Sequence, residues 1–173
     1  MAFTDLIERL LFHDECLDTL KPTLVTPTER LLTIRAATVE QLTGQPDLAD
    51  RAELVRAVFF YANDALSEAH TIVQQAPGGI ASYLHGIVHR REEDFDNARH
   101  WFRSAGELPF FAALQRAGAA HSEDVAKQTT WDPYLFAGLC ERHKYGARSS
   151  LKVLAELQKA EFRTLLDYTF RAG

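Results

Sequence analysis

Three side chains that can bind a metal ion recur along one stretch of the sequence at the spacing of helical turns. His85, His89 and Glu92 stand four and three residues apart, so a helix would place them on one face. Two imidazoles and a carboxylate form a mixed nitrogen and oxygen set that zinc, iron, nickel or manganese accepts. His70, in the preceding segment, could support this set. The spacing is therefore compatible with a divalent transition metal bound by His85, His89 and Glu92.

No complete catalytic motif accompanies these residues. A zinc protease carries Glu directly after the first His of such a pair, and Gly86 occupies that position. The sequence contains no nucleophile elbow, no Gly-rich phosphate loop and no paired-cysteine motif. Histidines at helix contacts are more often core residues hydrogen-bonded to a carboxylate or carbonyl group. The catalytic residues, and whether the protein is an enzyme, therefore stay open.

A carboxylate interrupts the apolar face of the last predicted helix. At about 100° per residue, Glu161 falls between Leu157 and Leu165. An unpaired buried carboxylate costs several kcal/mol or takes up a proton, so a buried Glu161 requires a cation or donor nearby. Alternatively, Glu161 lies at the rim of the core. The available partners are Arg90, Arg91, His85 and His89.

Arg90 and Trp101 complete the set of ligand-pocket candidates. The guanidinium of Arg90 could hold an anion or pair with the neighbouring acids. Trp101 precedes Phe102, so the two aromatic rings point to different sides, and Trp101 either fills a second interface or walls a pocket. The predicted pocket residues are His70, His85, His89, Arg90, Glu92, Trp101 and Glu161.

Helices must position all of these residues. Apolar residues recur at helical spacing on both sides of Glu92-Glu93-Asp94, which predicts a helical hairpin over residues 80–106. A continuous helix is expected from Asp50 to Gln75, antiparallel to the hairpin across the turn Pro77-Gly78-Gly79. The predicted fold is a single-domain all-α bundle of about seven helices over residues 1–173. The other helices are expected over residues 4–20, 26–44, 110–117, 132–146 and 149–170, with a long mobile loop at 118–130.

Composition and charge restrict the possible partners. With 173 residues, 46% of them apolar and 25% charged, the chain resembles an ordinary globular domain. Its net charge of -5 and scattered basic residues disfavour nucleic acid and anionic membranes. We expect no signal peptide and no membrane span, and therefore a cytoplasmic location. Cys16 and Cys140 lie far apart without metal-type spacing, and we assign neither a role. Spare apolar surface on an edge helix could support a homodimer.

The hairpin resembles a single tetratricopeptide repeat, a helix-turn-helix unit of about 34 residues. Small residues that let two helices approach occupy the repeat's usual places, and a large aromatic residue fills the gap beside them. A stable stack needs about three repeats, and no second copy occurs here at the same period. The resemblance implies a lone repeat-like hairpin within a bundle. The matching residues are Gly86, Ala98, Phe102, Ala105 and, one place early, Pro109, whereas His85 stands where the repeat has an apolar residue.

A longer string resembles a family of uncharacterised bacterial and fungal proteins. It runs from Glu68-Ala69-His70 through His85 and His89-Arg90-Arg91-Glu92 to Asp94, Asn97-Ala98 and Trp101-Phe102. Trp131-Asp132-Pro133 and Cys140-Glu141 are similar to a later part of that family. The resemblance points to these residues but supplies no reaction.

Two functions follow from the sequence. The first, which the absence of a complete motif favours, is a non-catalytic module that binds an unknown protein or small molecule. The second is a small helical metalloprotein, or a metal-dependent enzyme, that uses His85, His89 and Glu92. They differ in what a histidine substitution removes: stability alone in the first, bound metal in the second.

Overall fold

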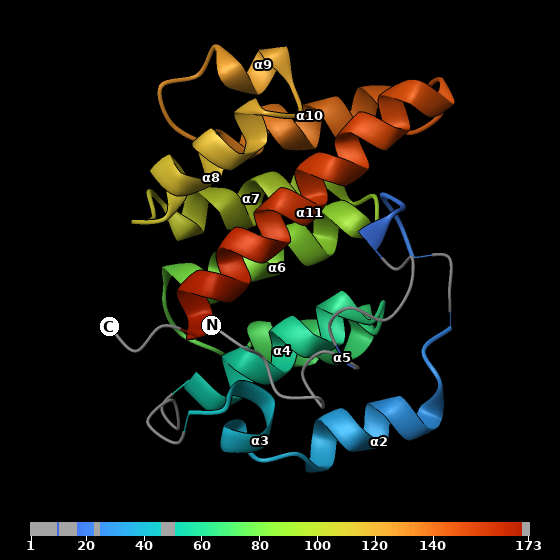
Figure 1. Ribbon diagram of the computed structural model, residues 1–173, viewed down its shortest axis with the longest axis vertical. Helices are drawn as coiled ribbons and strands as arrows, with labels where there is room; N and C mark the ends of the chain where they lie inside the picture. The colour runs from blue at the N-terminus through green and yellow to red at the C-terminus, as the bar shows by residue number, and fades with distance from the viewer. Residues whose placement is uncertain (1–9, 11–16, 23–24, 46–50, 171–173) are drawn as a thin grey trace.

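The computed structural model describes residues 10, 17–22, 25–45 and 51–170 of the chain. These residues form ten helices and no strand, which confirms the all-α class with more helices than the seven or so expected. In Figure 1, α2 to α5 form the lower part of the molecule and α6 to α11 the upper part. Most of the predicted helix at 4–20 lies outside the described residues, and residues 17–20, which are described, are not α-helical. The helices are α2 (Thr28–Ala36), α3 (Val39–Thr43), α4 (Ala52–Ala62), α5 (Leu66–Val73), α6 (Gly79–Arg91), α7 (Phe95–Ala105), α8 (Phe111–Ala119), α9 (Glu123–Ala126), α10 (Pro133–His143) and α11 (Arg148–Phe170).

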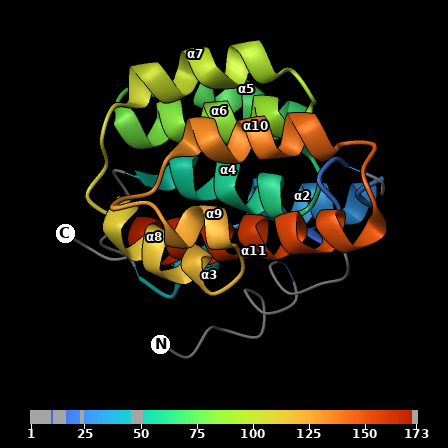
Figure 2. The same ribbon diagram turned by 90° about the horizontal axis from the view of Figure 1, so that it is seen from above.

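Helices α4 and α6 lie in the interior. Seven of the eleven residues of α4 and ten of the thirteen residues of α6 are buried, as expected for helices that are covered on most sides. Helix α4 packs against α2, α3, α5 and α11, and α6 packs against α5 and α7. Figure 2 shows both helices between α7 on one side and α11 on the other. Every polar side chain of α6 that points inward must therefore find a partner in the core.

The continuous helix predicted from Asp50 to Gln75 is wrong, because the chain breaks between α4 and α5. Asp64 adopts a left-handed backbone with φ of 59°, a conformation that Asp reaches more easily than most residues. Its carboxylate pairs with Arg91, with 2.6 Å between Oδ1 and Nη2 and both side chains fully buried. The amide of Asn63 donates to backbone carbonyls nearby. Tertiary partners that the helical pattern does not reveal thus stabilise the break.

The segment expected to form one helix from Thr26 to Gly44 is also divided. Thr38 starts α3 with its own capping box, in which its hydroxyl accepts from the backbone N–H of Gln41. Thr26, where the helix was expected to begin, does not cap α2, because its hydroxyl donates to the carbonyl of Asn63 and Pro27 occupies the N-cap position. Gly44 follows α3 in the left-handed conformation with φ of 71°, at the position where the predicted helix ends.

The helical hairpin forms as predicted from α6 and α7. Gly78, with φ of 95°, lies in the turn before α6, and Asp94 caps α7 by accepting from the backbone N–H of Asn97. The two helices touch at Gly86, where an added Cβ would lie 2.5 Å from Cε1 of Phe102. Only glycine permits this approach. The predicted roles of Gly86 and Phe102 in the hairpin are therefore met.

The C-terminal helices follow the predictions closely. Oδ1 of Asp132 caps α10 by accepting from the N–H groups of Tyr134 and Leu135 at 2.8 and 3.1 Å. Helix α11 ends at Phe170 as expected. The segment 118–130, predicted as a loop, contains the end of α8 and the short helix α9. Among the helices described, none combines the length and apolar composition that crossing a membrane requires.

Candidate metal centre

Three histidine side chains meet where α5 packs against α6. His70 comes from α5, His85 and His89 come from successive turns of α6, and one ring nitrogen of each lies within 4.8 Å of the others. Nε2 of His70 and Nε2 of His85 are hydrogen-bonded at 2.9 Å. The rings of His85 and His89 stack with centroids 4.8 Å apart, and the ring of His70 packs edge-on against both. These three residues, which we call the histidine cluster, could hold a metal ion.

Glu92, the C-cap residue of α6, lies against two of the imidazoles. Its Oε1 is 3.5 Å from Nδ1 of His70, and its Oε2 is 3.3 Å from Nδ1 of His89. A carboxylate at Nδ1 orients the ring and leaves Nε2 for a ligand, the arrangement common around metal-bound histidines. Within the described chain, the group of ligand atoms consists of the three histidine nitrogens without Glu92. Glu92 was predicted to be a metal ligand beside His85 and His89. In the structure it contacts the Nδ1 atoms of His70 and His89 and is not part of the group of ligand atoms.

The environment keeps the imidazoles of α6 uncharged. Burial lowers the pKa of His85 to about 4, and repulsion from the other histidines acts in the same direction. Burial also lowers the pKa of His89, although Glu92 and Asp94 oppose this change. Both rings are neutral at pH 7, which is the form that binds metals. Nδ1 of His85 is buried and has no hydrogen-bond partner among the described residues.

Trp101 covers the histidine cluster from α7. Its indole ring stacks on the imidazole of His85 with 3.9 Å between centroids and 21° between planes. His85 is only 2% exposed as a result of this cover and of its place on the central helix. Of the two roles predicted for Trp101, the wall of a site fits this contact.

Arg90 and Glu161 form an ion pair in the core. Glu161 is 0% exposed, and its Oε1 accepts hydrogen bonds from Nη1 of Arg90 at 2.9 Å and from the hydroxyl of Tyr83 at 2.6 Å. Nη2 of Arg90 donates to Oε2. The indole N–H of Trp131 donates to the oxygen of Tyr83 at 2.8 Å. Glu161 is therefore buried with a cation beside it, one of the two outcomes that the sequence left open.

The guanidinium of Arg90 keeps its charge beside Glu161. Burial disfavours the positive charge of Arg90, but the attraction and hydrogen bonds of Glu161 outweigh it and raise the pKa of Arg90. Burial also raises the pKa of Tyr83 well above its ordinary value, and the charge of Glu161 adds to this effect. Arg90 and Glu161 were predicted to line a ligand pocket. They bind one another and fasten α6 to α11 instead.

Sequence reasoning missed Asp64 and Tyr83 and gave His70 too small a part. The signal for Asp64 was Arg91, because a second Arg on a buried helix requires a carboxylate of its own. Asn63-Asp64 is also a pair of residues that favours turns, although it stands within an otherwise helical pattern. Nothing in the local pattern indicated that Tyr83 would donate to Glu161, since the two residues are far apart in sequence.

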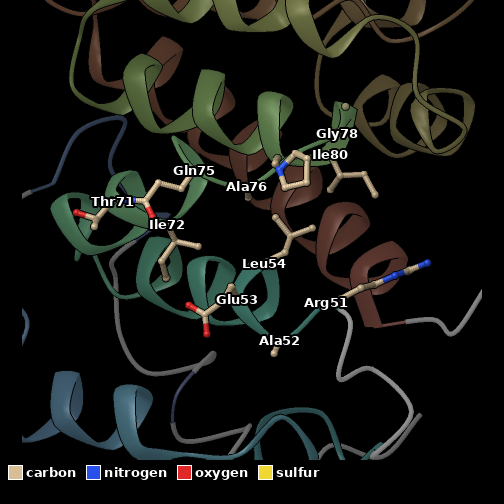
Figure 3. A pocket seen from close by; sticks show the side chains of 13 residues that line it. Arg51, Ala52, Glu53, Leu54, Thr71, Ile72, Gln75, Ala76, Gly78 and Ile80 are labelled. Atoms are coloured by element: carbon tan, nitrogen blue, oxygen red, sulfur yellow. The ribbon is translucent and has the colours of Figure 1, made fainter.

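A separate pocket of about 660 Å³ lies near the beginnings of α4 and α6 (Figure 3). Leu54, Ile72 and Ile80 contribute apolar walls, and Thr71 and Gln75 contribute polar groups. None of the predicted pocket residues lines it. The histidine cluster and this pocket are thus two distinct features.

Comparison with known proteins adds no assignment to this geometry. No protein-family model matches the chain, and no curated protein or solved structure matches it either.

Proposed function

We propose that the protein binds a divalent transition-metal ion through His70, His85 and His89. The observation that carries the proposal is the convergence of three ring nitrogens within 4.8 Å across two helices. The lowered pKa values of His85 and His89 support it, since a neutral imidazole needs no proton removed before it binds a metal.

The chemistry of the donor set indicates which metals fit. Three imidazoles suit zinc, nickel, copper or iron, whereas magnesium and calcium prefer oxygen ligands. Glu92 would hold the rings of His70 and His89 in place through their Nδ1 atoms. Three protein ligands are also the number that catalytic zinc sites use, with a further position for water or substrate. A metal held by the histidine cluster would act as a Lewis acid.

The test is a titration of the full chain, purified without affinity metals, with Zn²⁺ and with Ni²⁺ by calorimetry. We expect one equivalent to bind, and we expect His70→Ala to abolish binding while the helical circular dichroism is retained. His121→Ala is the matched control, because His121 is exposed and lies outside the histidine cluster. Absence of binding in the parent chain, or equal binding in His70→Ala and His121→Ala, would overturn the proposal.

Glu92→Gln refines the test. The amide keeps the size of the side chain but removes its charge, so the rings of His70 and His89 lose their anionic support. We expect metal affinity to fall about 10- to 100-fold without being lost. Complete loss would indicate that Glu92 is itself a ligand, as its helical spacing from His85 and His89 predicts.

A second candidate function is the partner-binding module, in a cytoplasmic protein, that the sequence favoured. The hairpin of α6 and α7 supports it, because its close contact at Gly86 and Phe102 resembles that of a tetratricopeptide repeat. Metal binding is compatible with this function, since a metal that joins α5 to α6 would stabilise such a module.

A further inference from the structure

Positive charge gathers at the turn between α10 and α11. The exposed side chains of Arg142, Arg148 and Lys152 and the half-buried side chain of Lys144 lie within eleven consecutive positions, which we call the basic turn. The whole chain has a net charge of -5, so this segment departs from its surroundings. In Figure 1 the connection lies at the upper right, where α10 passes into α11.

These cations have no acidic partners in the described parts of the chain. Arg99 pairs with Glu141, and Lys159 pairs with Asp18 and Glu156, but no such pair involves a member of the basic turn. The contacts of Lys144 are with aromatic rings. The nearby carboxylates are therefore engaged elsewhere, and the basic turn keeps its charge available.

The positions of two of these charges are unfavourable for the isolated protein. Arg148 and Lys152 lie in the first turns of α11, which carries no acidic residue in its first turn. The N-terminus of a helix is the positive end of its dipole, so cations placed there lower stability. An anion brought by a partner would relieve both this cost and the repulsion within the basic turn.

Exposed apolar groups accompany the charges. The side chain of Tyr145 is 83% exposed and that of Val153 is 41% exposed. Nζ of Lys144 lies 5.2 Å from the centroid of the Tyr145 ring, so charge and ring form one surface. Tyrosine is enriched at protein interfaces, where it buries a large ring with little loss of conformational freedom.

We propose that the basic turn is a docking surface for a short acidic peptide segment of a partner protein. The planar guanidinium of arginine can donate two parallel hydrogen bonds to a carboxylate. Tyr145 provides the apolar contact that a bound peptide requires. Single-stranded nucleic acid calls for several stacking aromatic rings along a basic groove, whereas Tyr145 stands by itself in the basic turn. Binding to a membrane surface requires a long apolar helix face beside the charges. This inference does not depend on the histidine cluster.

The test measures binding of a fluorescein-labelled oligoglutamate peptide to the full chain by fluorescence anisotropy. We expect binding that weakens with added salt and falls at least about tenfold in Arg148→Glu/Lys152→Glu. The control is Arg103→Glu/Arg163→Glu, which changes the net charge equally at two exposed positions outside the basic turn. Tyr145→Ala should also weaken binding, with unchanged thermal stability because the ring is exposed.

Two outcomes would overturn the proposal. One is an equal loss of binding in both double variants, which would mean that the peptide responds to the net charge of the protein and not to the basic turn. The other is tighter binding of oligouridine, or of vesicles of phosphatidylcholine and phosphatidylserine, than of the peptide. Either ligand would then replace the acidic peptide as the partner of the basic turn.

Discussion

The guanidinium of Arg90 and the carboxylate of Glu161 meet in the core through two parallel hydrogen bonds that join α6 to α11. Arg90 follows His89 directly, so this ion pair also fixes the end of the helix that carries two residues of the histidine cluster. A buried pair of this kind contributes little net stability by itself, but removal of one partner leaves an uncompensated charge.

Glu161→Gln should therefore destabilise the protein by about 3–5 kcal/mol. The amide still accepts from Tyr83, but the guanidinium of Arg90 loses its counter-charge in a region without solvent. Urea denaturation at pH 7 measures the change. The double variant Arg90→Met/Glu161→Met, which removes both charges, should lose less stability than Glu161→Gln. If Arg90→Met/Glu161→Met is less stable than Glu161→Gln, the ion pair itself is strongly stabilising.

Stability should fall as the pH is lowered below about 6.5. Burial lowers the pKa of His85 to about 4 in the folded protein, below its ordinary value of 6.5, so the unfolded chain binds more protons between these values. From pH 7 to pH 5 the contribution of His85 to the free energy of unfolding should drop by about 2 kcal/mol. His89, whose pKa is also lowered, acts in the same direction.

The check is urea denaturation of the parent chain and of His85→Phe at both pH values. Phenylalanine keeps a ring against Trp101 but takes up no proton. Its stability should depend less on pH. The same pH dependence in both proteins would assign the effect to other groups.

Gly86→Ala should destabilise the hairpin by about 1–3 kcal/mol, because the new methyl group would overlap the ring of Phe102. Gly138→Ala is the matched control on α10, where a Cβ meets the flexible end of Arg142 at 3.2 Å. Alanine favours helix over glycine, so this control should gain up to about 1 kcal/mol. Thermal unfolding measures both changes. Equal gains in both variants would mean that the ring of Phe102 moves aside freely.

Metal should stabilise the folded chain if the histidine cluster binds it. The ligands come from α5 and α6, so an ion would join the two helices. At a free Zn²⁺ concentration of about 100 times Kd, the free energy of unfolding should rise by about 2.7 kcal/mol. Thermal unfolding with and without Zn²⁺ measures this, and His70→Ala should show no rise. A rise of the same size in His70→Ala would place the ion elsewhere.

The features that sequence predicted well are those set by local pattern. The hairpin follows from apolar spacing around Glu92-Glu93-Asp94, and the start of α10 follows from Asp132 and the proline after it. Glu161 stands out in the sequence because its position on the apolar face of a single helix follows from helical periodicity alone. Its partner was among four candidates, since the choice of Arg90 depends on how α6 and α11 pack.

The features that sequence did not predict depend on contacts between distant residues. The helix predicted through Asp64 breaks there because the carboxylate of Asp64 forms a buried ion pair with Arg91 on α6. Glu92 was expected beside the histidines as a ligand, on the basis of helical spacing alone. It ends α6 as the C-cap, and there its two oxygens reach Nδ1 of His70 and of His89. Periodicity carries no information on which ring nitrogen a carboxylate approaches.

The short sequence span of the histidine cluster has a consequence for the order of folding. His70 and His85 are 15 residues apart, whereas Arg90 and Glu161 are 71 residues apart. Loop-closure entropy makes the longer closure about 1.4 kcal/mol more costly, so contacts among α5, α6 and α7 should form before α11 docks. The histidines would then assemble in a chain that is still incomplete. A metal present during refolding would act on that early state, before the core closes over Arg90.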